Sequence, residues 1–114
     1  MKNFMFLFHY GQSATPPAPE EMQANMQQWM DWVDQLKAKN IYVSGEALHP
    51  GGKLVKGAKK PLVTDGPFAE SKELVGGYFV VKAASLDEAA EIARQGYPDF
   101  SAGGGVEVRE VMVF

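Results

Sequence analysis

Apolar residues recur along this chain in two patterns, one typical of buried strands and one typical of amphipathic helices. Residues 4–9 are almost continuously apolar and aromatic, which predicts a strand buried on both faces. Residues 74–81 predict a second long strand of this kind, and residues 106–114 predict a strand that closes the chain. The glycine pair at 76–77 inside the second of these strands indicates a bulge or a close approach of two backbones.

The segment after the first strand has the period of a helix. Pro19 suits the first helical position, and we expect the helix to run from near Glu20 to Lys39, about five turns. Its apolar positions recur at steps of four, three, four and three, and we expect them to form one core-facing side: Met22, Met26, Trp29, Val33 and Leu36.

A second, shorter helix is predicted to begin at Ser85. Glu88 follows it by three residues, which is the spacing of a capping box. Gly96 and Pro98 mark the end of the helix. Its apolar stripe consists of Leu86, Ala89, Ala90 and Ala93.

Turn-forming residues fill the middle of the chain. The strand that precedes them is short, beginning at Ile41 and ending near Glu46 or Leu48. The tripeptide PGG at residues 50–52 then turns the chain, and short apolar runs follow it. Residues 47–73 are therefore predicted to form an inserted hairpin and loop.

Without this insertion, the predicted order is strand–helix–strand, twice. That order is typical of a ferredoxin-like α+β fold, an antiparallel sheet with two helices on one face. Residues 1–114 are expected to form one domain, because a chain of this length can bury a single core.

Two helices can cover only one face of such a sheet, yet the first strand is apolar on both. Phe4, Phe6 and Phe8 alternate with Met5 and Leu7. An uncovered face of this kind would be a large apolar patch, which soluble monomers rarely expose. We therefore expect a homodimer in which two sheets pack face to face.

Composition excludes several classes of function. The chain has no cysteine, so disulfides, thiolate catalysis and thiolate metal sites are absent. A formal net charge of −3 argues against direct nucleic-acid binding. No apolar run reaches the 18 or so residues of a membrane span, and the N-terminal apolar run is too short for a signal peptide. We therefore expect a cytoplasmic protein without membrane attachment.

The basic residues are unevenly distributed. Four of the 11 lie within eight positions: Lys53, Lys56, Lys59 and Lys60. One interpretation is a solvated hairpin whose lysines discourage pairing at a sheet edge. The other is a basic rim that attracts an anionic small molecule.

The segment TDGPFAESKE, residues 64–73, combines a turn, an aromatic ring and a charged run. Its order resembles DGPFAETKE, the signature of the DGPF proteins within the YCII-related family, with Ser71 in place of threonine. The resemblance implies a dimeric α+β barrel. It also implies a regulatory role, because DGPF-type domains are often associated with extracytoplasmic-function sigma factors.

Other branches of that family resemble small enzymes with a His–Asp pair, whose histidine lies near the start of the first helix. Here residues 19–23 contain no histidine. Tyr97 stands before Pro98, where the second partner of the pair is expected, and Asp99 follows. The resemblance therefore does not carry lyase- or dehalogenase-type catalysis to this chain.

His9 and Asp65 are the candidate catalytic residues. His9 ends the first strand, where it either acts as a general acid or base or forms a hydrogen bond at the sheet margin. Its parity with Met5 and Leu7 places its side chain on the packed side of the sheet. Asp65 either caps its own turn or pairs with His9 or His49 and orients the imidazole.

Four other residues are candidates for ligand binding. Glu46 and His49 lie at a strand end and a turn, in a segment similar to the GE-L-P segment of DGPF relatives. The alternative is a solvent-facing glutamate and a turn histidine. Phe68 and Lys72 belong to the DGPF-type segment. No metal or cofactor is expected, because the histidine spacing is not that of a metal site.

Two functions are consistent with these features. The first is a dimeric small-molecule-binding or regulatory accessory domain. The second is a small acid–base enzyme, isomerase- or lyase-like, that acts on a small aromatic or carboxylated substrate.

Overall fold

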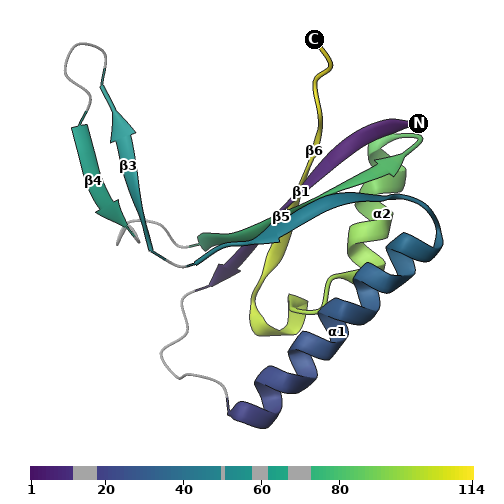
Figure 1. Cartoon of the computed structure of the whole chain (residues 1–114), viewed down its shortest axis with the longest axis horizontal. Coiled ribbons are helices and arrows are strands. Elements are labelled where there is room, and N and C mark those ends of the chain that lie inside the picture. Colours follow the sequence, from purple (N-terminus) through teal and green to yellow (C-terminus); the bar gives the residue numbers. More distant parts are fainter. Residues whose placement is uncertain (12–17, 50, 58–61, 67–72) are drawn as a thin grey trace.

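The computed structural model describes residues 1–11, 18–49, 51–57, 62–66 and 73–114, which form an α+β fold (Figure 1). A four-stranded sheet and two α-helices make up the body of these residues, and a two-stranded hairpin projects from it. The body consists of β1 (Lys2–Gly11), α1 (Pro19–Ala38), β2 (Tyr42–Ala47), β5 (Glu73–Ala83), α2 (Leu86–Gly96) and β6 (Gly105–Glu110). The hairpin consists of β3 (Gly52–Lys56) and β4 (Leu62–Gly66), and a 3-10 helix, η1 (Phe100–Ala102), precedes β6.

The strand order confirms the predicted ferredoxin-like fold. The strands lie in the order β2-β5-β1-β6, and each neighbouring pair is antiparallel. Both helices lie on the same side of this sheet, with α1 next to β2 and α2 next to β5 and β6 (Figure 1). No helix of the described residues covers the other side, which we call the open face.

Aromatic side chains of β1 pack against the helices and form the centre of the core. The ring of Phe6 stacks on Trp32 with centroids 6.0 Å apart, and the ring of Phe8 meets Trp29 edge-on at 4.8 Å. Phe79 of β5 meets Phe8 in the same edge-on manner at 4.8 Å. Such offset and edge-on pairs add favourable electrostatics to the burial of the rings. The first strand is therefore fully buried on one face only.

The methionines of α1 are not core residues, contrary to the expectation from their spacing. Met22 and Met26 are 58% and 64% exposed, whereas Trp32 and Leu36 are buried. The reason is the length of the helix: its N-terminal half extends beyond the sheet, where none of the described strands lies beneath it (Figure 1).

The second helix has the predicted start. The Ser85 Oγ accepts a hydrogen bond from the Glu88 backbone N–H at 3.1 Å, which satisfies one of the unpaired donors of the first turn. At the other end, Gly96 lies directly against the indole of Trp32. This close contact joins the two helices.

Two expected boundaries differ from the structure. The final strand ends at Glu110, and residues 111–114 continue without strand structure. Val111 still donates a backbone hydrogen bond to Asn3, but β1 begins at Lys2, so little backbone remains for pairing. Asp65 and Gly66 belong to strand β4, where the sequence suggested the start of a turn, and the turn expected at Pro67 lies outside the described residues.

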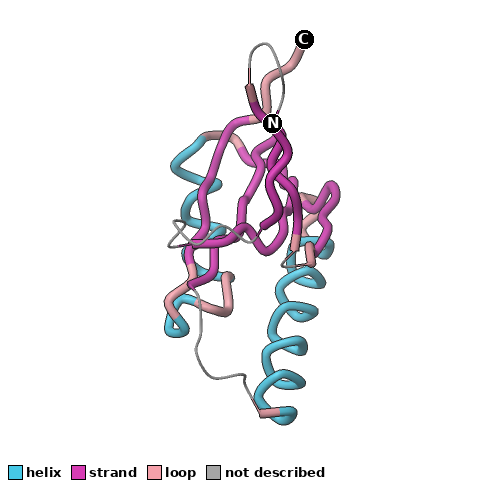
Figure 2. The backbone as a smooth tube through the Cα atoms, turned by 90° about the vertical axis from the view of Figure 1, so that its left-hand side faces the viewer, coloured by secondary structure: helices cyan, strands magenta, loops and turns pink. Residues whose placement is uncertain are grey.

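The open face keeps an apolar surface. Its central side chains are only partly buried: Met5, Leu7, Tyr78 and Val80. The hairpin and the C-terminal end project on this side of the sheet, opposite α1 (Figures 1 and 2). Neither helix of the described residues has the length and apolar composition needed to cross a lipid bilayer.

Candidate functional site

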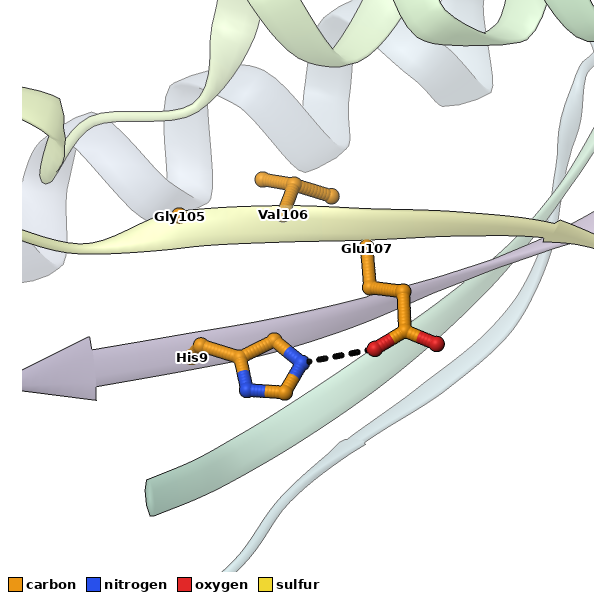
Figure 3. A pocket seen from close by; sticks show the side chains of 4 residues that line it. All are labelled: His9, Gly105, Val106 and Glu107. Atoms are coloured by element: carbon orange, nitrogen blue, oxygen red, sulfur yellow. Dashed lines mark hydrogen bonds and ion pairs between the residues drawn. The ribbon is translucent and has the colours of Figure 1, made fainter. Parts of the chain in front are cut away.

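His9 lies on the open face, and this corrects the sequence interpretation. Phe4, Phe6 and Phe8 face the helices, so the alternation of the strand directs the His9 side chain to the opposite side. Figure 3 shows the His9 and Glu107 side chains on one side of the sheet, with the Val106 side chain pointing to the other. His9 does share a side of the sheet with Met5 and Leu7, as predicted. The side that packs against the helices is the opposite one, which carries Phe4, Phe6 and Phe8.

Glu107 of β6 is the carboxylate beside His9. The imidazole Nε2 lies 3.2 Å from the Glu107 Oε1, which accepts the hydrogen bond from the ring N–H (Figure 3). The side chains of His9 and Glu107 are 21% and 44% exposed. Arg109 lies two residues farther along β6, and its Nη1 is 3.5 Å from the other carboxylate oxygen. The carboxylate therefore holds the ring in a fixed orientation while it also faces a cation.

A shallow depression of about 230 Å³ adjoins this pair, lined by His9, Gly105, Val106 and Glu107 (Figure 3). His9 stands opposite Gly105 in the pairing of β1 with β6. A Cβ built on Gly105 meets no atom within 4 Å, so the missing side chain leaves open space beside the imidazole. The arrangement offers a proton donor and acceptor next to a space for a small molecule.

On the helix side, a polar network fixes the backbone beneath His9. The Tyr97 hydroxyl donates a hydrogen bond to the His9 carbonyl oxygen at 3.3 Å. Burial, together with the nearby charge of Asp99, raises the pKa of Tyr97 from 10.0 to about 12. The Asp99 carboxylate accepts hydrogen bonds from the Trp29 indole N–H, at 3.1 Å, and from the Asn25 amide. These contacts tie α1 to the chain that leads into β6.

The other predicted site residues are spread over the chain. Glu46 lies on the open face opposite Tyr78, exposed, and its charge is the second cause, after burial, of the raised pKa of Tyr42. His49 follows β2 in an exposed position. Asp65 pairs with Lys53 in the hairpin, but its side chain lies outside the described part of the structure.

Phe68 and Lys72 also lie outside the described residues, so their proposed roles stay predictions. Glu107 was missed from the sequence. It lies 98 residues from His9, and only the register of β1 with β6 brings the two together. Among the described side chains, no group of three histidines or carboxylates is placed to hold a metal ion.

Three comparisons relate the chain to known proteins. A family model described as the YCII-related domain matches residues 3–114. An uncharacterized protein of Rhizobium meliloti (strain 1021) is 35% identical over 82 residues, a match that covers 64% of this chain and 66% of that protein, just under two thirds of its length. A solved structure of 5-chloro-2-hydroxyhydroquinone dehydrochlorinase from Burkholderia phenoliruptrix AC1100, in complex with 2,5-dihydroxybenzoquinone, has a TM-score of 0.47 and 18% identity, covering 96% of this chain and 95% of that one. Because the family model spans almost the whole sequence, the chain belongs to the YCII-related domain family.

Proposed function

We propose that this protein is a dimeric small-molecule-binding protein whose ligand lies on the open face, beside His9. The observation that supports this proposal most directly is the hydrogen-bonded pair of His9 and Glu107 at the edge of a depression. A histidine can donate and accept protons, and a carboxylate partner orients its ring.

The open face also supports the dimer. Met5, Leu7, Tyr78 and Val80 stay partly exposed in the single chain, and Val75 is 44% exposed. Packing against a second sheet would remove this apolar area from water, with the sheets about 10 Å apart. The same packing would enclose the depression at His9, which is open to solvent in one chain. Ligand sites bury most of the ligand surface, so the second copy would complete the site.

The neighbours of the depression favour a small aromatic or carboxylated ligand. Tyr78 and Leu7 occupy one row across the open face, with Glu46 at one end and Glu107 at the other. Apolar and aromatic side chains in that row can pack against a ring. The guanidinium of Arg109 can donate hydrogen bonds to a carboxylate or a hydroxyl group, and the imidazole of His9 can do so in its protonated form.

A thermal-shift screen tests the binding site. Benzoate, hydroxybenzoates and small aliphatic carboxylates are added to the wild type, His9→Gln and Gly105→Ala. Gly105→Ala places a methyl group in the depression without a clash, since its Cβ meets no atom within 4 Å. Gly51→Ala, in equally open surroundings away from the site, is the matched control.

A ligand at ten times its Kd should stabilise the wild type and Gly51→Ala by about 1.4 kcal/mol. The gain should shrink in both Gly105→Ala and His9→Gln. A ligand that stabilises all four proteins equally would show that binding occurs elsewhere.

A second function, acid–base catalysis, is favoured by the same hydrogen bond. His9 would exchange a proton with the substrate, and Glu107 would orient the ring and stabilise the imidazolium. The reaction class would be isomerisation or elimination. Exchange of carbon-bound hydrogen for deuterium in a bound ligand, followed by NMR, would distinguish this function, because pure binding predicts no exchange above that of His9→Gln.

The DGPF-type segment supports a regulatory context for the same protein. We propose that binding serves an accessory role beside a sigma factor in the cytoplasm, through protein or ligand contacts. A net charge of −3 opposes direct DNA contact. Copurification of a sigma factor with the tagged chain, compared with a tagged unrelated domain, would test this role.

A further inference from the structure

Three exposed methionines lie on one side of α1. Met22, Met26 and Met30 are 58%, 64% and 55% exposed, and we call them the methionine flank. Steps of four residues place them on one side of the helix, one above the other. Methionine adapts its shape to a partner, and contiguous apolar surface on a soluble protein indicates an interaction site.

Acidic residues border the methionine flank. Asp34 lies one turn beyond Met30 on the same side of the helix, between Asp31 three residues before it and Lys37 three residues after it. Asp31 and Asp34 are both exposed. The surface therefore fits a partner that combines aliphatic side chains with positive charge.

The β3–β4 hairpin has that character. Val55 is 58% exposed and Leu54 is 39% exposed. Lys53 lies two positions before Val55, so the two side chains emerge on the same face of the strand, and Lys53 stands opposite Asp65 of β4. The hairpin forms a two-stranded sheet of its own and projects from the body on the side opposite α1 (Figure 1).

Within one chain, the hairpin projects away from α1 (Figure 1). The hairpin leaves the sheet at the same end as β1. The strand pairing shows this, because Phe8, near the end of β1, and Ala47, the last residue of β2, both pair with Gly77. In a face-to-face pair, the hairpin of one copy would extend toward the helices of the other. A five-residue strand is about 16 Å long, more than the roughly 10 Å between packed sheets, so the hairpin would extend past the partner's sheet toward the helix layer behind it.

We propose that the β3–β4 hairpin of each copy docks on the methionine flank of the other copy's α1. Val55 contacts Met26, and Lys53 lies near Asp34. This docking rests on the proposed face-to-face dimer, and it gives the hairpin a function as the arm that holds the two copies together. It also accounts for a helix that extends beyond its own sheet.

Disulfide cross-linking tests the docking directly, because the chain has no cysteine of its own. Val55→Cys protein is mixed with Met26→Cys protein, the subunits are allowed to exchange, and a mild oxidant is added. A disulfide forms only when the two Cα atoms approach to about 4.4–6.8 Å. Gln28→Cys is the matched control, since Gln28 is exposed on the same helix but points away from the methionine flank.

The Val55–Met26 mixture should give a linked dimer on non-reducing gels, at least about tenfold more than the Val55–Gln28 mixture. Equal yields from both mixtures would refute the docking. A dimer by light scattering without the Val55–Met26 link would refute the docking and leave the dimer intact. A mass of one chain, 12.5 kDa, at micromolar concentration would refute both.

A charge exchange provides an independent measurement. Lys53→Glu should weaken dimerisation by about two- to fivefold, as expected for the loss of one exposed ion pair. Combining it with Asp34→Lys should restore the wild-type dissociation constant. An unchanged constant in Lys53→Glu, or no recovery in the double variant, would place Lys53 outside the interface.

Discussion

Gly96→Ala is expected to destabilise the protein, although alanine is the better helix former. Gly96 is the last residue of α2, and a Cβ built there would lie 1.9 Å from the Nε1 of Trp32. Two further atoms of the indole would lie at 2.4 and 2.5 Å. Real Cβ atoms do not approach other heavy atoms so closely, so either the indole or the helix must move.

The gain in helix propensity and the cost of overpacking determine whether Gly96→Ala stabilises or destabilises the protein. Alanine in place of glycine inside a helix gains about 0.5–1 kcal/mol. Overpacking a core costs about 1–3 kcal/mol. The indole cannot rotate away cheaply, because Trp32 is 3% exposed and its ring packs on Phe6 and Phe79, with centroids at 6.0 and 5.2 Å. The upper end of the overpacking cost therefore applies, and a net loss of about 2 kcal/mol is expected.

Urea unfolding followed by tryptophan fluorescence measures this loss, with all variants at one protein concentration because dimerisation would couple to unfolding. Gly105→Ala is the control, since its Cβ meets no atom within 4 Å, and it should change the free energy of unfolding by less than about 0.5 kcal/mol. A Gly96→Ala protein as stable as the wild type would refute the rigid packing of Trp32 against α2.

Three other changes have defined outcomes. Asp99→Ala leaves the Trp29 indole N–H without its charged acceptor, so the free energy of unfolding in urea should fall by about 2 kcal/mol. Ser85→Ala removes the cap of α2 and should lower it by about 1 kcal/mol in the same assay, whereas Ser85→Asp should retain stability. Because the folded pKa of Tyr97 is raised from 10.0 to about 12, the unfolded chain loses this proton first, and stability should fall as pH rises from 10 toward 12. Urea midpoints across this range should fall less in Tyr97→Phe.

Periodicity predicted the elements well because each is defined by local sequence. The Ser85 cap and the position of both helices follow from spacing alone. The exposure of Met22 and Met26 does not follow from spacing. The helical period shows which side chains share a face, but the area of sheet beneath that face depends on how far the strands extend, which is a property of the assembled fold.

In the candidate site, too, some features follow from local sequence and others depend on the assembled fold. His9 could be found in the sequence, because a histidine at the end of an apolar strand is a local signal. Its partner Glu107 carries no local signal and required the register of β1 with β6, in which Leu7 pairs with Glu107. The side of the sheet on which His9 lies also required the structure, since alternation gives two sets of side chains without saying which set the helices cover.

The glycine pair of β5 links the fold to the site. The expected irregularity is present: His9 pairs with Val75, so Gly76 is the extra residue of a bulge. A Cβ on Gly76 would lie 2.7 Å from the Tyr10 ring, and one on Gly77 would lie 2.6 Å from a backbone oxygen of β2. A larger residue at Gly77 would push β2 away from β5, and one at Gly76 would displace the Tyr10 ring. Because the bulge brings Val75 beside the imidazole, the apolar side of the site arises from a sheet irregularity that only small residues permit.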